Sequence, residues 1–242
     1  MKGPRQAIDT TFDFRTDTPA GKDPDSHSPT LRRYHQLLWS KPLPDGTPFT
    51  LTTATKARYL HHVSARGEFT LTSDSVVHSY RNWARMAPVI NQIPASELDE
   101  FQRLGYTIGG MMVFPGTRRP GVHTINGERG LNPSIGDRMD LTLECIRLHY
   151  EGAESPMSRT LHAYGDFFAL FDDFSGYVEF FLLQDLVSAD GRVTMLLPHR
   201  GFDESPLPTS VDEYREYRDA SLALVHARNA RIDAWERDHL GS

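Results

Sequence analysis

The sequence predicts an α+β protein, a predominantly helical single domain with a small, mainly antiparallel sheet. Apolar residues recur at helical spacing in several segments, whereas only a few short segments alternate as strands do. The chain of 242 residues, 38% of them hydrophobic, is long enough to bury a sizeable core. No internal repeat or linker divides it, so we assign residues 1–242 to one domain.

The N-terminal part begins with turn formers and continues into a helix. Residues 1–28 are polar and rich in proline, glycine and aspartate, which predicts an extended segment. Ser28 followed by Pro29 is typical of a helix N-cap and first turn. The helical pattern then runs to Trp39, and Pro42 lies just beyond it.

The middle of the chain mixes strands and helices. Two loosely alternating segments are separated by a short turn containing Gly67, which predicts a pair of strands. Gly109 and Gly110 suggest a bulge or a close backbone approach within a buried strand. The expected elements are strands at 58–63 and 68–72, a helix at 76–90, a helix at 97–104 and a strand at 106–114.

The C-terminal half is mainly helical in pattern. We expect helices at 134–150, 157–171 and 177–187, a strand at 192–197 and a long helix at 210–239. Ser210 is the expected N-cap of the last helix, which would be roughly 45 Å long at 1.5 Å per residue.

Composition excludes several classes of protein. The net charge of −6 opposes a bulk electrostatic nucleic-acid binder, and no run of 18 apolar residues could span a membrane. The first residues lack the apolar stretch of a secretory signal. Cys145 is the single cysteine, so it can form no intramolecular disulfide, and a buried, unreactive thiol is expected there. We therefore expect a cytoplasmic protein.

Several sequence motifs are missing. No two glycines are two residues apart, which excludes the dinucleotide-binding fingerprint. There is no Gly-Lys-Ser/Thr of a P-loop, no His-Glu pair of a zincin helix, and no serine centred between two glycines as in hydrolases. The sequence therefore names no cofactor.

The segment 115–133 is the strongest candidate for a ligand site. It has no periodicity, contains four glycines, and concentrates basic residues in an acidic protein. It also leads into a helix whose first amides attract anions. These features predict a small anionic or phosphorylated ligand, neutralised by arginines and oriented by neighbouring polar side chains: Arg118, Arg119, Arg129, His123 and Asn126.

The following helical segment contains carboxylates among leucines. Asp137, Asp140 and Glu144 are spaced to share one side of a helix. Ion pairing with Arg138 and Arg147 is the structural interpretation. The functional interpretation makes Asp137, together with His123, the catalytic pair, or makes Asp137 one ligand of a divalent cation.

Three functions are therefore compatible with the sequence, and whether the protein is an enzyme stays open. The first is binding of a small anion at 115–133, with or without catalysis. The second is a protein- or nucleic-acid-interaction module that uses either the arginine-containing loop or the last helix with its aromatic residues Tyr214, Tyr217 and Trp235. The third is a metal-dependent hydrolase built on Asp137, Asp140 and Glu144.

Longer stretches of the sequence look like a known family. Phe12-Asp13-Phe14-Arg15-Thr16-Asp17-Thr18-Pro19, the segment from Ser28 to Pro44, and Asp137 to Arg147 carry the likeness, as does Gly176-Tyr177 with the residues that follow. Together they resemble a bacterial family of unknown function along nearly the whole chain. The resemblance implies a bacterial, non-membrane protein of one domain, and it implies no activity or site residues.

Overall fold

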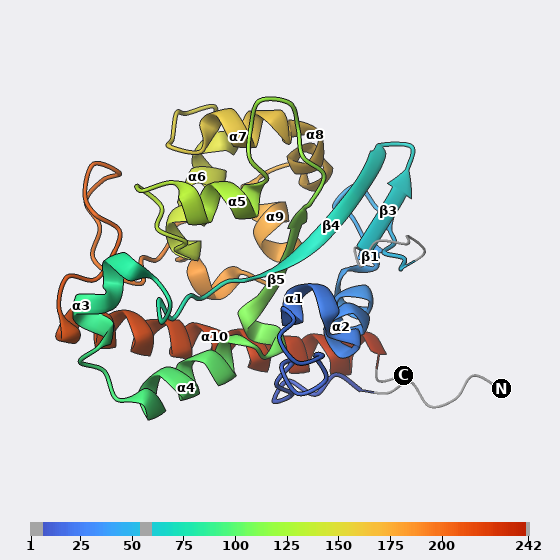
Figure 1. The fold of residues 1–242 in the computed structure, drawn as a ribbon. Coiled ribbons are helices and arrows are strands. Elements are labelled where there is room, and N and C mark those ends of the chain that lie inside the picture. Colours follow the sequence, from blue (N-terminus) through green and yellow to red (C-terminus); the bar gives the residue numbers. More distant parts are fainter. Residues whose placement is uncertain (1–6, 54–59, 241–242) are drawn as a thin grey trace.

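The computed structural model describes residues 7–53 and 60–240 (Figure 1). Its two sheets are antiparallel: β1 (Lys41–Pro42) pairs with β2 (Pro48–Phe49), and a larger sheet has the order β3-β4-β5. The strands of the larger sheet are β3 (Leu60–Ser64), β4 (Gly67–Ser75) and β5 (Met111–Pro115). The expected α+β architecture, mainly helical with small antiparallel sheets, is confirmed.

Helices pack against β4 and β5 of the larger sheet. The α-helices of the described residues are α1 (Pro24–His27), α2 (Pro29–Trp39), α3 (Ala87–Ile90), α4 (Ala95–Gly105), α5 (Ile125–Leu131), α6 (Met139–Tyr150), α7 (Ser158–Ala163), α8 (Gly165–Phe168), α9 (Phe174–Phe180) and α10 (Val211–Leu240). The short 3₁₀ turns are η1 (Ala84–Met86), η2 (Ile108–Gly110), η3 (Ala169–Phe171) and η4 (Gln184–Leu186).

The clearest sequence patterns are confirmed. Helix α2 has the expected bounds, and Ser28 caps it by accepting a hydrogen bond from the Leu31 N–H at 3.0 Å. The expected strand pair is the β3–β4 hairpin, although residues 58 and 59 of the first expected strand lie outside the described residues, as do residues 1–6 of the expected extended segment.

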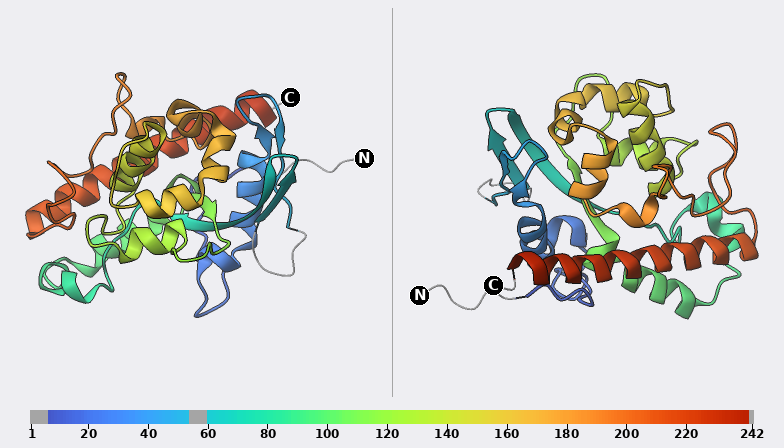
Figure 2. Two further views of the ribbon diagram at one scale, coloured as in Figure 1. Left: turned by 90° about the horizontal axis from the view of Figure 1, so that it is seen from above. Right: turned by 180° about the vertical axis from the view of Figure 1, so that it is seen from behind.

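Helix α10 extends across the molecule with α4 beside it (Figures 1 and 2). Its Ser210 cap accepts from the Glu213 N–H, as expected. Gly109 in η2 lies against it, because a Cβ there would be 2.6 Å from the Val225 carbonyl oxygen. The close approach predicted at the two glycines is therefore confirmed, while the expected strand begins only at Met111.

Two expected elements between residues 76 and 133 are wrong. Residues 76–83 are not helical: Tyr80 has φ +56°, and the His78 Nδ1 accepts from the Tyr80 N–H instead of leaving it to a helix. Residues 115–133 are not without regular structure, because α5 forms inside them. Thr124 caps α5 through the Gly127 N–H, and burial of one face stabilises it despite its glycines.

Helix boundaries also differ in the C-terminal half. Helix α6 begins at Met139 rather than 134, since Gly136 and Asp137 have positive φ. The expected 157–171 and 177–187 helices are broken into shorter helices and 3₁₀ turns. Residues 192–197 form an isolated bridge at Val193 instead of a strand, and the Leu196 N–H donates to the Asp140 carboxylate.

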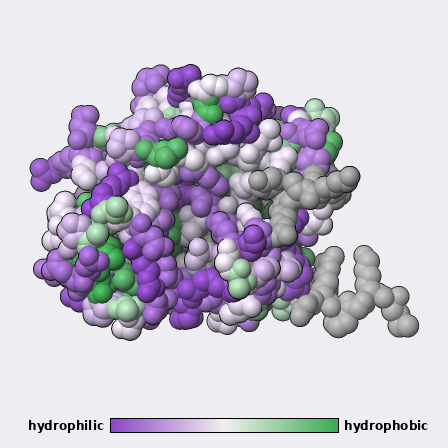
Figure 3. Space-filling model, in the orientation of Figure 1, coloured by the Kyte–Doolittle hydropathy of each residue, from purple (hydrophilic) through white to green (hydrophobic). Residues whose placement is uncertain are grey.

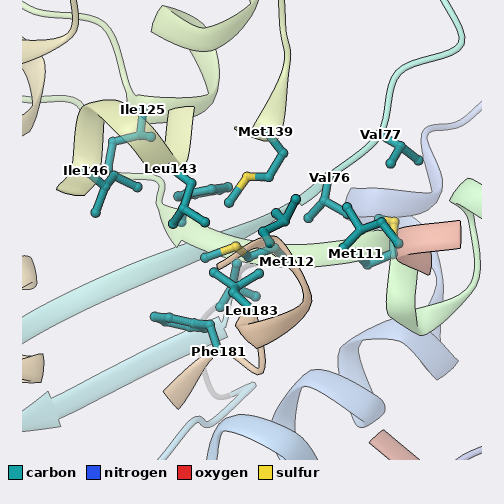
Figure 4. Close-up of a cluster of buried hydrophobic side chains, with 14 of the residues drawn as sticks. Val76, Val77, Met111, Met112, Ile125, Met139, Leu143, Ile146, Phe181 and Leu183 are labelled. Carbon is teal, nitrogen blue, oxygen red and sulfur yellow. The ribbon is translucent and has the colours of Figure 1, made fainter. Parts of the chain in front are cut away.

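The hydrophobic core joins β4 and β5 to the surrounding helices. Figure 4 shows part of it, where Met112 of β5 lies near Leu143 of α6 and Leu183 of the segment after α9, and Met111 lies beside Val76 and Val77. Cys145 is buried on α6, as expected, and burial raises the pKa of its thiol to about 12. Hydrophilic residues cover most of the face in Figure 3. In the described part of the chain, no helix is both long and apolar enough to cross a bilayer.

Candidate functional site

The structure brings together two of the residues singled out in the sequence, Arg129 and Asp137. The Arg129 side chain is fully buried on α5, and its Nη2 lies 3.4 Å from the Asp137 Oδ1. The same guanidinium forms a second ion pair, 2.8 Å from Nη1 to the Asp74 Oδ2. One buried cation therefore holds two carboxylates that are 63 positions apart in the sequence (137 − 74).

The spacing of side chains along β4 and α5 explains which of their residues meet at this site. Thr72 and Asp74 are two residues apart on β4 and so project to the same side of the strand. Asn126 and Arg129 are three apart on α5 and share one face of the helix. The Asn126 amide donates to the Thr72 hydroxyl at 3.3 Å, and Arg129 binds Asp74 beside it.

A tight turn places Asp137. Gly136 has φ +58° and Asp137 has φ +61°, a left-handed conformation that aspartate tolerates better than most residues. The Asp137 N–H donates to the Arg129 carbonyl at 2.9 Å, and the Tyr80 hydroxyl donates to the Gly136 carbonyl at 2.8 Å. A non-glycine residue in this region costs of order 1 kcal/mol, a strain found often at functional sites.

The third carboxylate, Asp25, comes from α1, which packs against β4. Asp23 caps α1 through the Asp25 N–H, and Pro24 occupies the first turn, so the sequence Asp-Pro-Asp fixes this short helix. The Asp25 Oδ1 is buried without a hydrogen-bond partner among the described residues. We call Asp25, Asp74 and Asp137 with Arg129 the carboxylate cluster.

The cluster holds more negative than positive charge, and this shifts its protonation. Burial raises the pKa of Asp74 to about 7, an effect that Asp137 strengthens and Arg129 opposes. Burial also raises the pKa of Asp25 well above its ordinary value, with Asp74 adding to the shift. One guanidinium cannot neutralise the charge of three carboxylates, so the cluster retains a proton near neutral pH.

His78 connects the cluster to a pocket. Its Nδ1 accepts the Tyr80 N–H, so a neutral ring carries its proton on Nε2, which faces the Asp137 Oδ2 at 3.8 Å. Burial lowers the pKa of His78, which favours this neutral form. His78, Ser75 and Tyr106 line a pocket of about 150 Å³, which has room for a small ligand.

The other basic residues expected at the site point elsewhere. Arg119 bonds to Asp166 at 2.5 Å and lies over the Tyr164 ring. Arg118 and His123 are exposed on the loop before α5. Arg129 points into the protein and shares no partner with them, so the expected convergence of the three arginines on one ligand is not what the structure shows.

The remaining acidic candidates are paired. Asp140 is fully buried against Arg138, as the ion-pair interpretation predicts, and Glu144 bonds to Arg147 at 2.7 Å. Asp137 precedes α6 and binds Arg129 instead. Within residues 7–53 and 60–240 no group of three or more histidine, cysteine or acidic side chains could hold a metal ion.

The aromatic residues expected at an interface are mostly internal. Tyr214 and Tyr217 are fully buried, and their hydroxyls bond to the Ser79 carbonyl and the His78 N–H. Trp235 is half-buried and stacks on His239. Burial of the two tyrosines removes most of the surface on which an interaction role for this helix would depend.

The sequence pattern missed Asp74 and His78. Asp74 lies just past the alternating segment 68–72 and continues the half-buried central strand beyond Phe69 and Leu71, and no local pattern marks it as part of a site. Asp25 is visible in the sequence as part of Asp-Pro-Asp, but nothing local connects it to residues 74, 129 and 137.

The fold and site together define a helical α+β protein with a proton-retaining carboxylate cluster beside a small pocket. The chain belongs to the family described as "Family of unknown function (DUF6994)", whose model matches residues 8–232. This confirms the family resemblance found in the sequence. Searches of curated proteins and of solved structures found no match.

Proposed function

We propose that the protein is an acid–base catalyst that acts on a small uncharged or cationic substrate at the carboxylate cluster. The observation that carries this proposal is that one buried guanidinium is paired with both Asp74 and Asp137, while the buried Asp25 interacts electrostatically with it and with Asp74. A site with surplus negative charge attracts a cation or a neutral group that can exchange a proton, and it repels phosphate. The ligand favoured at the carboxylate cluster is therefore uncharged or cationic, whereas the sequence predicted an anion at Arg129.

The cluster contains the two partners that proton transfer requires. Asp74, protonated near neutral pH, is suited to donate a proton to a leaving group. Asp137, held by Arg129, is the carboxylate suited to accept a proton from water or substrate. In a hydrolysis the acid loses its proton to the leaving atom and the base takes one from the attacking water. Solvent then carries one proton from the base back to the acid, which restores both groups.

Ligand binding with matched variants tests the proposal. Thermal denaturation is measured with panels of uncharged sugars and amides, small amines and guanidines, and phosphates. We expect stabilisation by a neutral or cationic member that is lost in Asp74→Asn and Asp137→Asn. The control Asp166→Asn removes a surface carboxylate and should keep the response, because Asp166 binds Arg119 and the Phe167 N–H and lies outside the carboxylate cluster. Stabilisation by phosphates alone, or equally in all variants, contradicts the proposal.

Turnover is tested on chromogenic p-nitrophenyl compounds. Neutral glycosides and carboxylic esters are compared with phosphate and sulfate esters, and hydrolysis of a neutral compound should fall at least 10²-fold in Asp74→Asn, the scale of general acid–base catalysis. Hydrolysis of the anionic esters alone contradicts the charge argument.

Anion binding at the exposed part of the basic loop is a second candidate. Arg118 and Arg119 both act electrostatically on the Tyr164 hydroxyl, and a Cβ at Gly121 would lie 3.2 Å from the Arg159 Nη2. Three guanidinium groups thus gather around residues 117–121, with Asp166 bound to one of them. Stabilisation by phosphate that disappears in Arg118→Ala/Arg119→Ala supports this site; equal stabilisation in the double variant rejects it.

We also propose a cytoplasmic location. The single cysteine, which leaves no partner for an intramolecular disulfide, supports it. Fractionation of the cells that make the protein, with detection by antibody, tests this directly.

A further inference from the structure

A groove at the opposite end of α10 from its N-cap contains a lysine in an unusual setting. The groove has a volume of about 700 Å³ and lies between β1, α9 and the last turns of α10. Lys41, Phe180, Gln184, Arg231 and Trp235 are among its lining residues. None of these residues belongs to the carboxylate cluster, so the groove is a separate candidate site.

Aromatic rings surround the Lys41 ammonium. Its Nζ lies 5.3 Å from the Trp39 ring centroid, 4.8 Å from that of Phe180 and 5.5 Å from that of Trp235. Rings attract a cation but replace hydration only in part. Burial, together with the charge of the buried Arg228, therefore lowers the pKa of Lys41 to about 8, while the Glu179 carboxylate opposes this shift.

The amine is not committed to an ion pair. Among the described residues no carboxylate lies within 4.0 Å of the Lys41 Nζ, whereas Arg231 in the same groove binds Asp185 through two hydrogen bonds of 2.9 and 2.8 Å. A desolvated, unpaired lysine amine on the wall of a groove is the arrangement that makes lysine a nucleophile.

A second polar group in the groove is also without a partner. The Gln184 Oε1 is buried and accepts no hydrogen bond from the described residues. Buried amide oxygens normally have a donor, so this acceptor is available for a ligand hydroxyl. Phe180 and Trp235 form an aromatic wall near Lys41, which suits a planar hydrophobic group, while Glu179 and Asp238 add carboxylates to the same lining.

From this geometry we propose that Lys41 forms a Schiff base with a small aldehyde or ketone that carries an apolar, planar group. The neutral amine attacks the carbonyl carbon, and proton transfer from nitrogen to oxygen gives a carbinolamine. Loss of the hydroxyl as water, with a proton taken from solvent, leaves a protonated C=N bond, which can return that proton to solvent. Gln184 accepts the carbinolamine hydroxyl, and Trp235 and Phe180 contact the planar group.

Reductive trapping tests the proposal with benzaldehyde as the probe. The full chain is incubated with benzaldehyde and sodium cyanoborohydride, whose hydride reduces the imine to a stable benzylamine, and the modified lysines are counted by peptide mass spectrometry. The chain has four lysines, Lys2, Lys22, Lys41 and Lys56, and exposed Lys22 is the internal control. A lysine of pKa about 8 has roughly two hundred times more neutral amine at pH 7 than an unperturbed lysine.

We expect Lys41 to be modified at least tenfold faster than Lys22 at pH 7, with a rate that rises to a plateau above pH 8. Unfolding in urea should remove the difference. Trp235→Ala, which opens one wall, should slow modification of Lys41 severalfold, and Asp74→Asn should leave it unchanged because the two sites are separate. Equal rates at Lys41 and Lys22 in the folded chain would overturn the proposal, as would a preference that survives in urea.

Discussion

Replacing Arg129 by glutamine tests how much the carboxylate cluster depends on its one cation. The native side chain donates to Thr142, Asp74, the Ser75 carbonyl and the Asp137 carbonyl, and it forms ion pairs with both carboxylates. Glutamine retains at most one or two of these hydrogen bonds. Removing one partner of a buried ion pair costs about 3–5 kcal/mol, so we expect a loss of about 4 kcal/mol at pH 8.

The loss should depend on pH with a definite sign. The folded-state pKa of Asp74 is raised, so its protonated form stabilises the fold below about pH 4 and that stabilisation is lost as the pH rises to about 7. Arg129 limits this loss of stability because its charge opposes the rise of the Asp74 pKa. Without Arg129 the pKa of Asp74 rises further, and the variant should lose about twice as much stability at pH 8 as at pH 5.

Urea unfolding followed by circular dichroism at pH 5 and pH 8 measures the unfolding free energy lost in Arg129→Gln and the pH dependence of that loss. At about 2–4 °C per kcal/mol for a chain of this size, the melting temperature at pH 8 should fall by roughly 8–16 °C. The control Arg147→Gln breaks only helix-surface pairs with Glu144 and Glu151 and should cost less than about 1 kcal/mol. If Arg129→Gln costs no more than this control, or the same at both pH values, the electrostatic reasoning is refuted.

Three further predictions concern single residues. Ser28→Ala should cost about 1 kcal/mol of unfolding free energy in urea, because it removes the N-cap of α2; an unchanged midpoint contradicts the capping role. Arg228→Leu should cost about 3 kcal/mol or more by the same assay, since the buried guanidinium donates to the carbonyls of Gly109, Met111, Phe181 and Leu182; a loss below about 1 kcal/mol contradicts it. Cys145 should not react with a thiol reagent in the folded chain at pH 8 but should give one equivalent in urea, because burial raises the pKa of its thiol to about 12.

Elements with local signals could be predicted from the sequence. Ser28-Pro29 marks the start of α2, and the apolar stripe of α10 continues over thirty residues, so both were correctly expected. Residues 76–90 have a helical pattern as well. There, Tyr80 adopts a left-handed conformation, and its hydroxyl bonds to Gly136, a residue far away in the sequence. Tertiary contacts of this kind override local periodicity.

For the same reason, only part of the candidate site could be predicted from the sequence. Arg129 and Asp137 stood out because they lie in or beside a basic, glycine-rich segment, but their partners Asp25 and Asp74 come from α1 and β4. Sequence spacing shows which residues share a face of one element and not which faces meet. From the sequence we predicted that Arg129 binds an anionic ligand. In the fold it instead forms ion pairs with two carboxylates of the protein itself, Asp74 and Asp137.

The central claim is that the carboxylate cluster retains a proton near neutral pH. Carboxyl-carbon NMR of the chain labelled at aspartate, titrated from pH 3 to pH 9, measures this directly. We expect a resonance with a midpoint at about 7 that is missing from Asp74→Asn, and Asp166→Asn should keep it. If every aspartate resonance titrates below pH 5, the cluster holds no proton at neutral pH and the account is contradicted.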